Sequence, residues 1–225
     1  MSKLERLRKN IEAIRVAFAR ETTSELEPGA LEAYMGFGGM NFILNPLNIE
    51  AWSKSDMPYY NDTVRLHDVL NKYIKSEEKR KRWMQSLKAS VLTAFYTPKP
   101  IVDGIVQSIL MGMTNNKDFK RVLDPAAGNG AFAFEMWNHV VHQLDAEVVA
   151  YEKDLLSGLI LKHIHPTWNR FDARVKGFET IPDTDLGTFD LVTTNVPFGD
   201  IRVFDPAYTH SDNAARRDAV KYIHR

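Results

Sequence analysis

Residues 121–130 read Arg-Val-Leu-Asp-Pro-Ala-Ala-Gly-Asn-Gly, a short apolar run that leads into an aspartate and a glycine-containing loop. We interpret 121–124 as a strand and 129–143 as the helix that follows the loop. The glycines at 128 and 130 allow the backbone to come close to a ligand where this helix begins. Dinucleotide-binding folds share this order of strand, loop and helix, so the stretch predicts a nucleotide-type site without defining its ligand.

The rest of residues 95–225 alternates between strands and helices. We predict helices near 129–143 and 154–163, another over 101–111 that begins after Thr97, and strands near 121–124, 147–151, 173–177 and 189–194. This alternation predicts a parallel, doubly wound α/β sheet of the Rossmann-like type. In such sheets ligands bind at the carboxyl ends of the strands, and Asp124 lies at one of these ends.

The second predicted strand is followed by Glu152, which comes 28 residues after Asp124. That spacing suits one strand–helix–strand unit, so both carboxylates are expected at the same edge of the sheet. A carboxylate after the second strand can accept hydrogen bonds from both hydroxyls of a ribose. The alternative is that Asp124 and Glu152 are ordinary polar residues at strand ends.

Another polar turn follows the last predicted strand, where the chain reads Asn195-Val196-Pro197-Phe198. A turn of this kind can bring an amide, an outward-facing backbone carbonyl and an aromatic face into one small space. Those groups are needed to hold a flat ring that carries an amine. The alternative is a simple Asn-x-Pro turn with Phe198 buried in the core.

Residues 1–94 have a different pattern, which predicts a helical N-terminal domain with helices near 3–20, 31–35 and 61–94. The glycines of Gly36-Phe37-Gly38-Gly39 indicate either a helix C-cap with a turn, or a loop that packs closely or contacts a ligand. The basic run Lys79-Arg80-Lys81-Arg82 is typical of a solvated helix face, and contact with a DNA backbone is the alternative.

The composition limits the classes of function. Lys and Arg together number 29, as do Asp and Glu, so the formal charge is zero, which is not typical of strong nucleic-acid binding. The chain has no cysteine, which excludes disulfides, cysteine-based zinc sites and a cysteine nucleophile. No signal-peptide pattern or long apolar run occurs, so we expect neither secretion nor a membrane span. The histidines have no partner cluster, and we expect no metal site.

The loop at 124–130 and the turn at 195–198 together resemble the motifs of N6-adenine DNA methyltransferases, which use S-adenosylmethionine. Those enzymes place an aromatic-Thr-Pro element before the first helix of the domain, and Tyr96-Thr97-Pro98 matches it. The resemblance implies that Tyr96 and Thr97 contact the methionine end of the cofactor and that Glu152 holds the ribose. It further implies that the loop residues line the methionine and sugar: Asp124, Pro125, Ala126, Gly128 and Gly130. For an acidic residue near the adenine the candidate is Glu179, with Asp183 and Asp185 as alternatives.

The resemblance also assigns roles to the turn at 195–198. The Asn195 side-chain oxygen and the Val196 carbonyl accept hydrogen bonds from the amino group of a flipped adenine, Pro197 turns that carbonyl outward, and Phe198 stacks on the base. The family usually has proline where this chain has Val196. The same turn occurs in methyltransferases that act on protein glutamine or on rRNA guanine, so these acceptors remain alternatives.

Residues 7–14 and 36–39 are similar to the N-terminal part of large methylase–helicase fusion proteins of phages and conjugative elements. This implies DNA as a partner, a bacterial or phage-encoded cytoplasmic protein, a link to restriction–modification or its evasion, and continuation into a longer chain. Because a full methyltransferase sheet has further strands after the fourth, we expect the 95–225 domain to be incomplete at its C-terminus and weakly active or inactive alone. A non-catalytic DNA or protein interaction module is the alternative.

Overall fold

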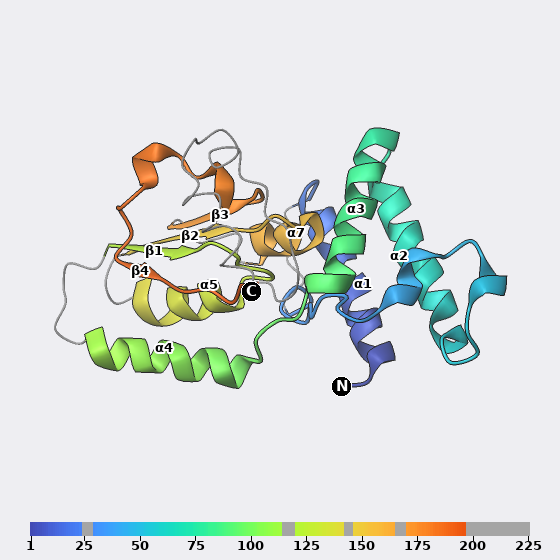
Figure 1. Ribbon diagram of the computed structural model, residues 1–225, viewed down its shortest axis with the longest axis horizontal. Helices are drawn as coiled ribbons and strands as arrows, with labels where there is room; N and C mark the ends of the chain where they lie inside the picture. Colours follow the sequence, from blue (N-terminus) through green and yellow to red (C-terminus); the bar gives the residue numbers. More distant parts are fainter. Residues whose placement is uncertain (24–28, 114–119, 142–145, 165–169, 197–225) are drawn as a thin grey trace, which may run out of the picture. The chain divides into compact units, whose positions relative to one another are not determined.

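The computed structural model describes residues 1–23, 29–113, 120–141, 146–164 and 170–196 (Figure 1). The described strands form one sheet in the order β3-β2-β1-β4, and every neighbouring pair is parallel. Its strands are β1 (Arg121–Asp124), β2 (Glu147–Tyr151), β3 (Phe171–Arg174) and β4 (Leu191–Val192). This arrangement confirms the predicted Rossmann-like α/β fold. The third strand begins two residues earlier than the predicted 173–177, and the fourth is shorter than 189–194.

The order of the strands creates a reversal beside β1. From β1 the chain winds outward through β2 to β3, and it then returns to add β4 on the other side of β1. Leu123 pairs with Val149 of β2 and with Val192 of β4. In open α/β sheets, the carboxyl ends of the strands beside such a reversal form the usual ligand-binding crevice. Asp124, at the end of β1, therefore lies at the expected position.

Alternate residues of the central strands pack on opposite faces of the sheet, as period-two geometry requires. One face is covered by α4 (Lys99–Met113) and α5 (Ala131–Met136), which lie on the same side of the sheet in Figure 1. Its core comprises Val102, Val106, Val122, Phe132, Met136, Val148, Ala150 and Leu161. On the other face, Ile181 and Phe189 pack against Leu123, Val149 and Tyr151. The sheet is thus covered on both sides near β1.

Two helices begin at the carboxyl ends of β1 and β2. The helix α5 starts after Gly130 and continues as a short π-helical turn, Trp137–Val141, within the predicted range of 129–143. The helix α7 (Leu155–His163) agrees with the predicted 154–163. Its N-cap is Asp154, whose side chain accepts a hydrogen bond from the Ser157 amide.

The N-terminal part is rich in helices, namely α1 (Lys3–Arg20), α2 (Tyr60–Tyr73) and α3 (Glu77–Thr93). Three short 3-10 helices, Asn41–Leu44, Ile49–Ala51 and Met57–Tyr59, lie between α1 and α2. The predicted helical region 61–94 divides into two helices, because Ser76 caps a new helix by accepting from the Lys79 amide.

The predicted short helix at 31–35 is wrong, because residues 29–33 form turns. The side chain of Asn10, fully buried in α1, donates to the Gly36 carbonyl at 2.7 Å and accepts from the Met35 amide at 2.8 Å. The Asn10 side chain thus satisfies the Met35 amide and the Gly36 carbonyl, so these backbone groups do not require the hydrogen bonds of a helix. The same finding removes the helix C-cap interpretation of Gly36-Phe37-Gly38-Gly39 and leaves a closely packed loop.

The N-terminal helices and the sheet share a hydrophobic core. Leu156, Leu159 and Ile160 of α7 belong to the same cluster as the buried apolar residues of α1, α2 and α3. Residues 1–195 accordingly form one compact unit. The division into an N-terminal domain of residues 1–94 and a domain from residue 95 stays a prediction. In the part of the chain that the structure describes, no helix has the length and apolarity needed to cross a bilayer.

Candidate functional site

Asp124 occupies the center of the sheet edge, at the end of β1. The residue is 1% exposed, and its Oδ1 atom accepts a hydrogen bond from the Ala126 amide at 3.3 Å. Burial raises the pKa of this carboxyl to about 8, and the negative charge of Glu152 acts in the same direction. Burying an ionisable group without a cation is unfavourable, so this aspartate is not explained by stability alone.

Glu152 follows β2 and is held by two backbone amides. Its Oε2 accepts from the Gly128 amide at 2.7 Å, and its Oε1 accepts from the Asp154 amide at 2.6 Å. Burial raises the pKa of Glu152 to about 7, opposed by these hydrogen bonds. A carboxylate oxygen can accept more than one hydrogen bond, so each oxygen retains acceptor capacity for a ligand hydroxyl.

The loop between β1 and α5 contains two glycines with positive φ. Gly128 and Gly130 have φ values of 58° and 87°, in the left-handed region that favours glycine. A Cβ atom added at Gly128 would lie 2.7 Å from the Tyr96 ring, so the loop and this ring are in close contact. Tyr96 is in turn fixed by a 2.6 Å hydrogen bond between its hydroxyl and Ser157 Oγ. Pro125 and Ala126, at the start of the loop, are partly exposed.

Asn195 joins this site from the far side of β1. Its Nδ2 atom donates to Thr97 Oγ1 at 2.9 Å, across 98 residues of sequence. Thr97 precedes α4, which begins at Lys99, so this hydroxyl serves as the acceptor for Asn195. Thr193, two residues before Asn195, donates its amide to the Leu123 carbonyl at 2.9 Å, which holds this segment beside β1. The structure thus brings Thr97 and Asn195 together.

The remaining predicted residues of the turn are placed only in part. Val196 is 55% exposed. Pro197 and Phe198 lie outside the described residues, and their predicted roles stay predictions. Thr193 Oγ1 is buried and has no hydrogen-bond partner among the described residues, which leaves an unsatisfied polar atom near the end of β4.

Two of the acidic candidates after β3, Glu179 and Asp185, form ion pairs with basic side chains of the chain itself. Glu179 accepts a hydrogen bond from Lys153 Nζ at 2.6 Å, and Lys153 is the neighbour of Glu152. Asp185 is bound to Arg174 at 2.6 Å and to Arg121 at 3.4 Å. Glu179 is therefore the candidate tied to the Glu152 segment, and its cofactor role stays a prediction.

Two supporting contacts were not foreseen from the sequence. Asn129, inside the glycine loop, donates to the Tyr34 carbonyl at 2.9 Å and so connects the loop to the N-terminal part. Asp154 Oδ2 accepts from Ser86 Oγ of α3 at 2.5 Å, which connects α3 to α7. Both contacts join residues far apart in the sequence, and neither had a sequence signal.

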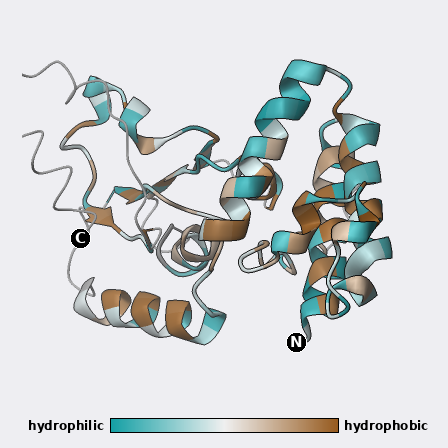
Figure 2. Ribbon diagram, turned by 45° about the vertical axis from the view of Figure 1, so that its right-hand side comes forward, coloured by the Kyte–Doolittle hydropathy of each residue, from teal (hydrophilic) through white to brown (hydrophobic). Residues whose placement is uncertain are grey.

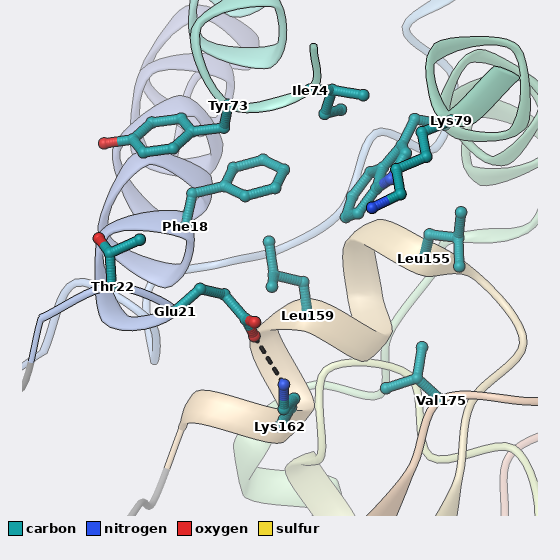
Figure 3. A pocket seen from close by; sticks show the side chains of 11 residues that line it. Phe18, Glu21, Thr22, Tyr73, Ile74, Lys79, Leu155, Leu159, Lys162 and Val175 are labelled. Carbon is teal, nitrogen blue, oxygen red and sulfur yellow. Dashed lines mark hydrogen bonds and ion pairs between the residues drawn. The ribbon is translucent and has the colours of Figure 1, made fainter. Parts of the chain in front are cut away.

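A pocket of about 390 Å³ lies elsewhere, between α1, α2, α3 and α7 (Figure 3). Phe18, Tyr73 and Trp83 supply its aromatic lining, and Lys79 and Lys162 are two of its charged residues. None of its lining residues is a predicted site residue. The predicted site is therefore the polar sheet edge around Asp124, Glu152 and Asn195, and not this pocket.

The fold and the sheet edge define a class: α/β proteins with a parallel sheet whose strand order reverses beside β1, where Asp124, Glu152 and Asn195 lie at the strand ends. Comparison with known proteins narrows the class. The family described as N-6 DNA Methylase matches residues 83–221. The chain belongs to this family. A search of curated proteins finds no match.

Among solved structures, one similar chain is a proposed class I S-adenosylmethionine-dependent methyltransferase from Listeria monocytogenes. It shares 15% sequence identity, the match covers 88% of the present chain, and the TM-score is 0.43. The match covers 60% of the Listeria chain.

Membership of the N-6 DNA methylase family implies S-adenosylmethionine as the cofactor. The residues present fit this molecule. Asp124 and Glu152 are two carboxylates whose pKa values are raised, and no cation is among the groups that lower them. A ligand that carries a sulfonium and an ammonium would supply the missing positive charge, while its ribose hydroxyls would donate to Glu152.

Proposed function

We propose that this chain carries the cofactor-binding and catalytic residues of a DNA methyltransferase that modifies the N6 amino group of adenine. The observation that carries the proposal is the hydrogen bond from Asn195 Nδ2 to Thr97 Oγ1 at 2.9 Å. Because the amide nitrogen is engaged there, the side-chain oxygen is the atom left to accept a hydrogen bond from a substrate amine. The family assignment over residues 83–221 supports methyl transfer to DNA as the reaction.

Asp124 and Glu152 hold the cofactor in this proposal. When bound, S-adenosylmethionine supplies an electrophilic methyl group that passes to nitrogen, with the bonding electron pair leaving to sulfur and one amine proton going to water. The role of Asp124 is to favour the cationic end of the molecule, and the role of Glu152 is to accept from its ribose. The Gly128 loop permits close approach of the backbone.

Asn195 acts on the acceptor. The amino nitrogen of adenine is a poor nucleophile, because its lone pair is delocalised into the ring. Hydrogen bonds accepted by Asn195 Oδ1 and by the Val196 carbonyl favour the tetrahedral nitrogen that develops during attack. Replacement of the usual proline by Val196 keeps that carbonyl, so the acceptor pair is retained. Phe198 would stack on the base.

DNA adenine is the acceptor we favour over protein glutamine or rRNA guanine, because the matching family is defined by DNA methylation. We further propose a cytoplasmic, bacterial or phage-encoded setting, a role in restriction–modification or its evasion, and linkage to a helicase. These follow from the resemblance of residues 7–14 and 36–39 to methylase–helicase proteins.

The test measures transfer of a labelled methyl group by the full-length protein to duplex DNA, to rRNA and to a glutamine-containing peptide. We expect labelling of adenine in DNA, and a loss of about 100-fold or more in Asn195→Ala with cofactor binding retained. The exposed Asn71→Ala variant is the matched control. Unchanged methylation by Asn195→Ala would refute the proposed role, and labelling of RNA or peptide alone would refute DNA as the acceptor.

A further inference from the structure

The corner between α2 and α3 concentrates positive charge. Residues 72–88 carry seven cationic and two acidic side chains, a net charge of +5 in a chain whose total formal charge is zero. The cationic residues, called the basic corner here, are all exposed: Lys72, Lys75, Lys79, Arg80, Lys81, Arg82 and Lys88. Figure 2 shows the N-terminal half of α3 as hydrophilic. The rest of the chain therefore has a net charge of −5, so the corner is a local feature and not a property of the whole surface.

Among the residues that the structure describes, most cations of the basic corner have no acidic partner, whereas several cations of α1 do. In α1, Lys9 pairs with Glu5 at 3.0 Å, and Arg15 pairs with Glu12 at 2.6 Å. In the basic corner Lys81 pairs with Glu77 at 3.5 Å, and within the described ranges no carboxylate pairs with Lys79, Arg80, Arg82 or Lys88.

Like charges three or four residues apart destabilise a helix, so an unpaired basic run has a cost. An external polyanion would offset this cost, since it supplies the countercharge that the chain itself does not provide.

The basic corner is held at a set distance from the catalytic turn. The helix α3 has 17 residues, and at about 1.5 Å per residue it is roughly 25 Å long. Its C-terminal end leads within four residues to Thr97, the partner of Asn195. Ser86 fixes α3 to α7, because its Oγ donates to Asp154 Oδ2 at 2.5 Å and accepts from the Leu155 amide at 2.7 Å. One turn of B-DNA spans about 34 Å, so a duplex engaged at Asn195 can also reach the corner.

We propose that the basic corner is a docking surface for the sugar-phosphate backbone of duplex DNA, and this rests on the proposed function. The contact is sequence-independent and positions the duplex along α3, while selection of the base belongs to the turn at Asn195. Lys79 lines the aromatic pocket opposite Phe18 and Tyr73 (Figure 3), and it is exposed. The zero total charge of the chain is compatible with DNA docking at the basic corner, because the excess positive charge is concentrated in residues 72–88.

The test is fluorescence anisotropy with a labelled 30-base-pair duplex and the 225-residue chain, at several salt concentrations. We expect the double variant Arg80→Glu/Arg82→Glu to weaken binding at least 10-fold. It should also reduce the slope of log K against log salt by about 2, because two phosphate contacts are lost. The control Lys54→Glu/Lys120→Glu makes the same change in charge at exposed positions outside the corner and should alter the affinity less than 3-fold.

Equal weakening by the two double variants, or no binding of DNA by the unsubstituted chain at 50 mM salt, would overturn the proposal. Binding through Arg80 and Arg82 to phosphatidylserine vesicles but not to DNA would also overturn it. The Asn195→Ala variant separates this inference from the proposed function. Unchanged methylation by this variant would remove the catalytic assignment and leave the docking surface standing, whereas equal weakening of DNA binding by the two double variants would remove the docking surface alone.

Discussion

At the residue scale, the site is built from groups that reduce the stability of the fold. Asp124 is buried and its pKa is raised, and the pKa of Glu152 is raised as well. Groups of this kind are retained where a ligand, rather than the fold, supplies the compensating charge. The hydrogen bond between Asn195 and Thr97 has a different character, because in the proposed mechanism it leaves the amide oxygen of Asn195 to face the substrate.

The carboxylate pair predicts how stability depends on pH. A folded-state pKa of about 8 for Asp124, above its ordinary value of 3.8, means that the folded chain binds more protons than the unfolded chain between these limits. Stability should therefore fall as pH rises from 5 to 8, by roughly 3–4 kcal/mol, at about 1.4 kcal/mol per pH unit. Asp124→Asn should flatten this fall and should be more stable than the unsubstituted chain at pH 8. Urea unfolding at each pH measures the free energy of unfolding of both proteins, and the variant Asp183→Asn, at an exposed position, is the control. Parallel curves for all three proteins would contradict the account.

Thr97 gives a second prediction at this scale. Thr97→Val keeps the shape of the side chain and removes the hydroxyl that accepts from Asn195, whereas Thr97→Ser keeps the hydroxyl. We expect Thr97→Val to lower kcat for DNA methylation about 10- to 100-fold, with Thr97→Ser near the original rate. The Kd for S-adenosylmethionine should stay within about 2-fold in both variants if the hydroxyl acts mainly through Asn195. A raised Kd with unchanged kcat would instead assign Thr97 to cofactor binding alone.

At the element scale, the sequence predicts what depends on local periodicity. The bounds of α1, β1 and β2 follow from apolar spacing and from the polar residues that end the strands. The division between α2 and α3 and the turns at 29–33 were missed, because Ser76 and Asn10 provide hydrogen bonds that a hydrophobic pattern does not reveal. The proximity of Asp124 and Glu152 could be predicted, because one strand–helix–strand unit separates them. The contact of Asn195 with Thr97 could not be predicted from local spacing, because the two residues are 98 positions apart in the sequence.

Asp154 links two elements, and its loss tests that link. Its carboxylate caps α7 through the Ser157 amide at 2.8 Å and accepts from Ser86 of α3. We expect Asp154→Ala to reduce the free energy of unfolding by about 2–3 kcal/mol, more than a simple N-cap deletion. Ser76→Ala, which removes only the N-cap of α3, should cost about 0.5–1 kcal/mol. Chemical denaturation compares the two, and equal losses would show that the contact with Ser86 adds nothing.

At the scale of the whole molecule, the N-terminal part and the sheet are joined around the loop between β1 and α5. Asn129 of that loop bonds to the Tyr34 carbonyl, and a Cβ at Gly36 or at Gly128 would meet the Tyr96 ring at 2.9 or 2.7 Å. The ring is therefore confined between an N-terminal loop and the loop that follows β1. Changes in the N-terminal part are expected to reach the cofactor site through these contacts.

The shared core predicts cooperative unfolding. Because α7 contributes to the same cluster as α1, α2 and α3, we expect residues on both sides of position 94 to unfold in one transition. Native-state hydrogen exchange measures this, since amides of α1 and β2 should reach the same free energy of opening. If α1–α3 open at a distinctly lower free energy, residues 1–94 behave as a domain of their own.

The central claim is that the carboxylates at the ends of β1 and β2 bind S-adenosylmethionine. Isothermal titration of the chain with this molecule tests it most directly, with Asp124→Asn, Glu152→Gln and the exposed control Asp183→Asn measured in parallel. We predict binding by the unsubstituted chain and by the control, and a loss of affinity of about 10-fold or more in each of the other two variants. An affinity unchanged by both substitutions, or no binding by the unsubstituted chain, would contradict the account.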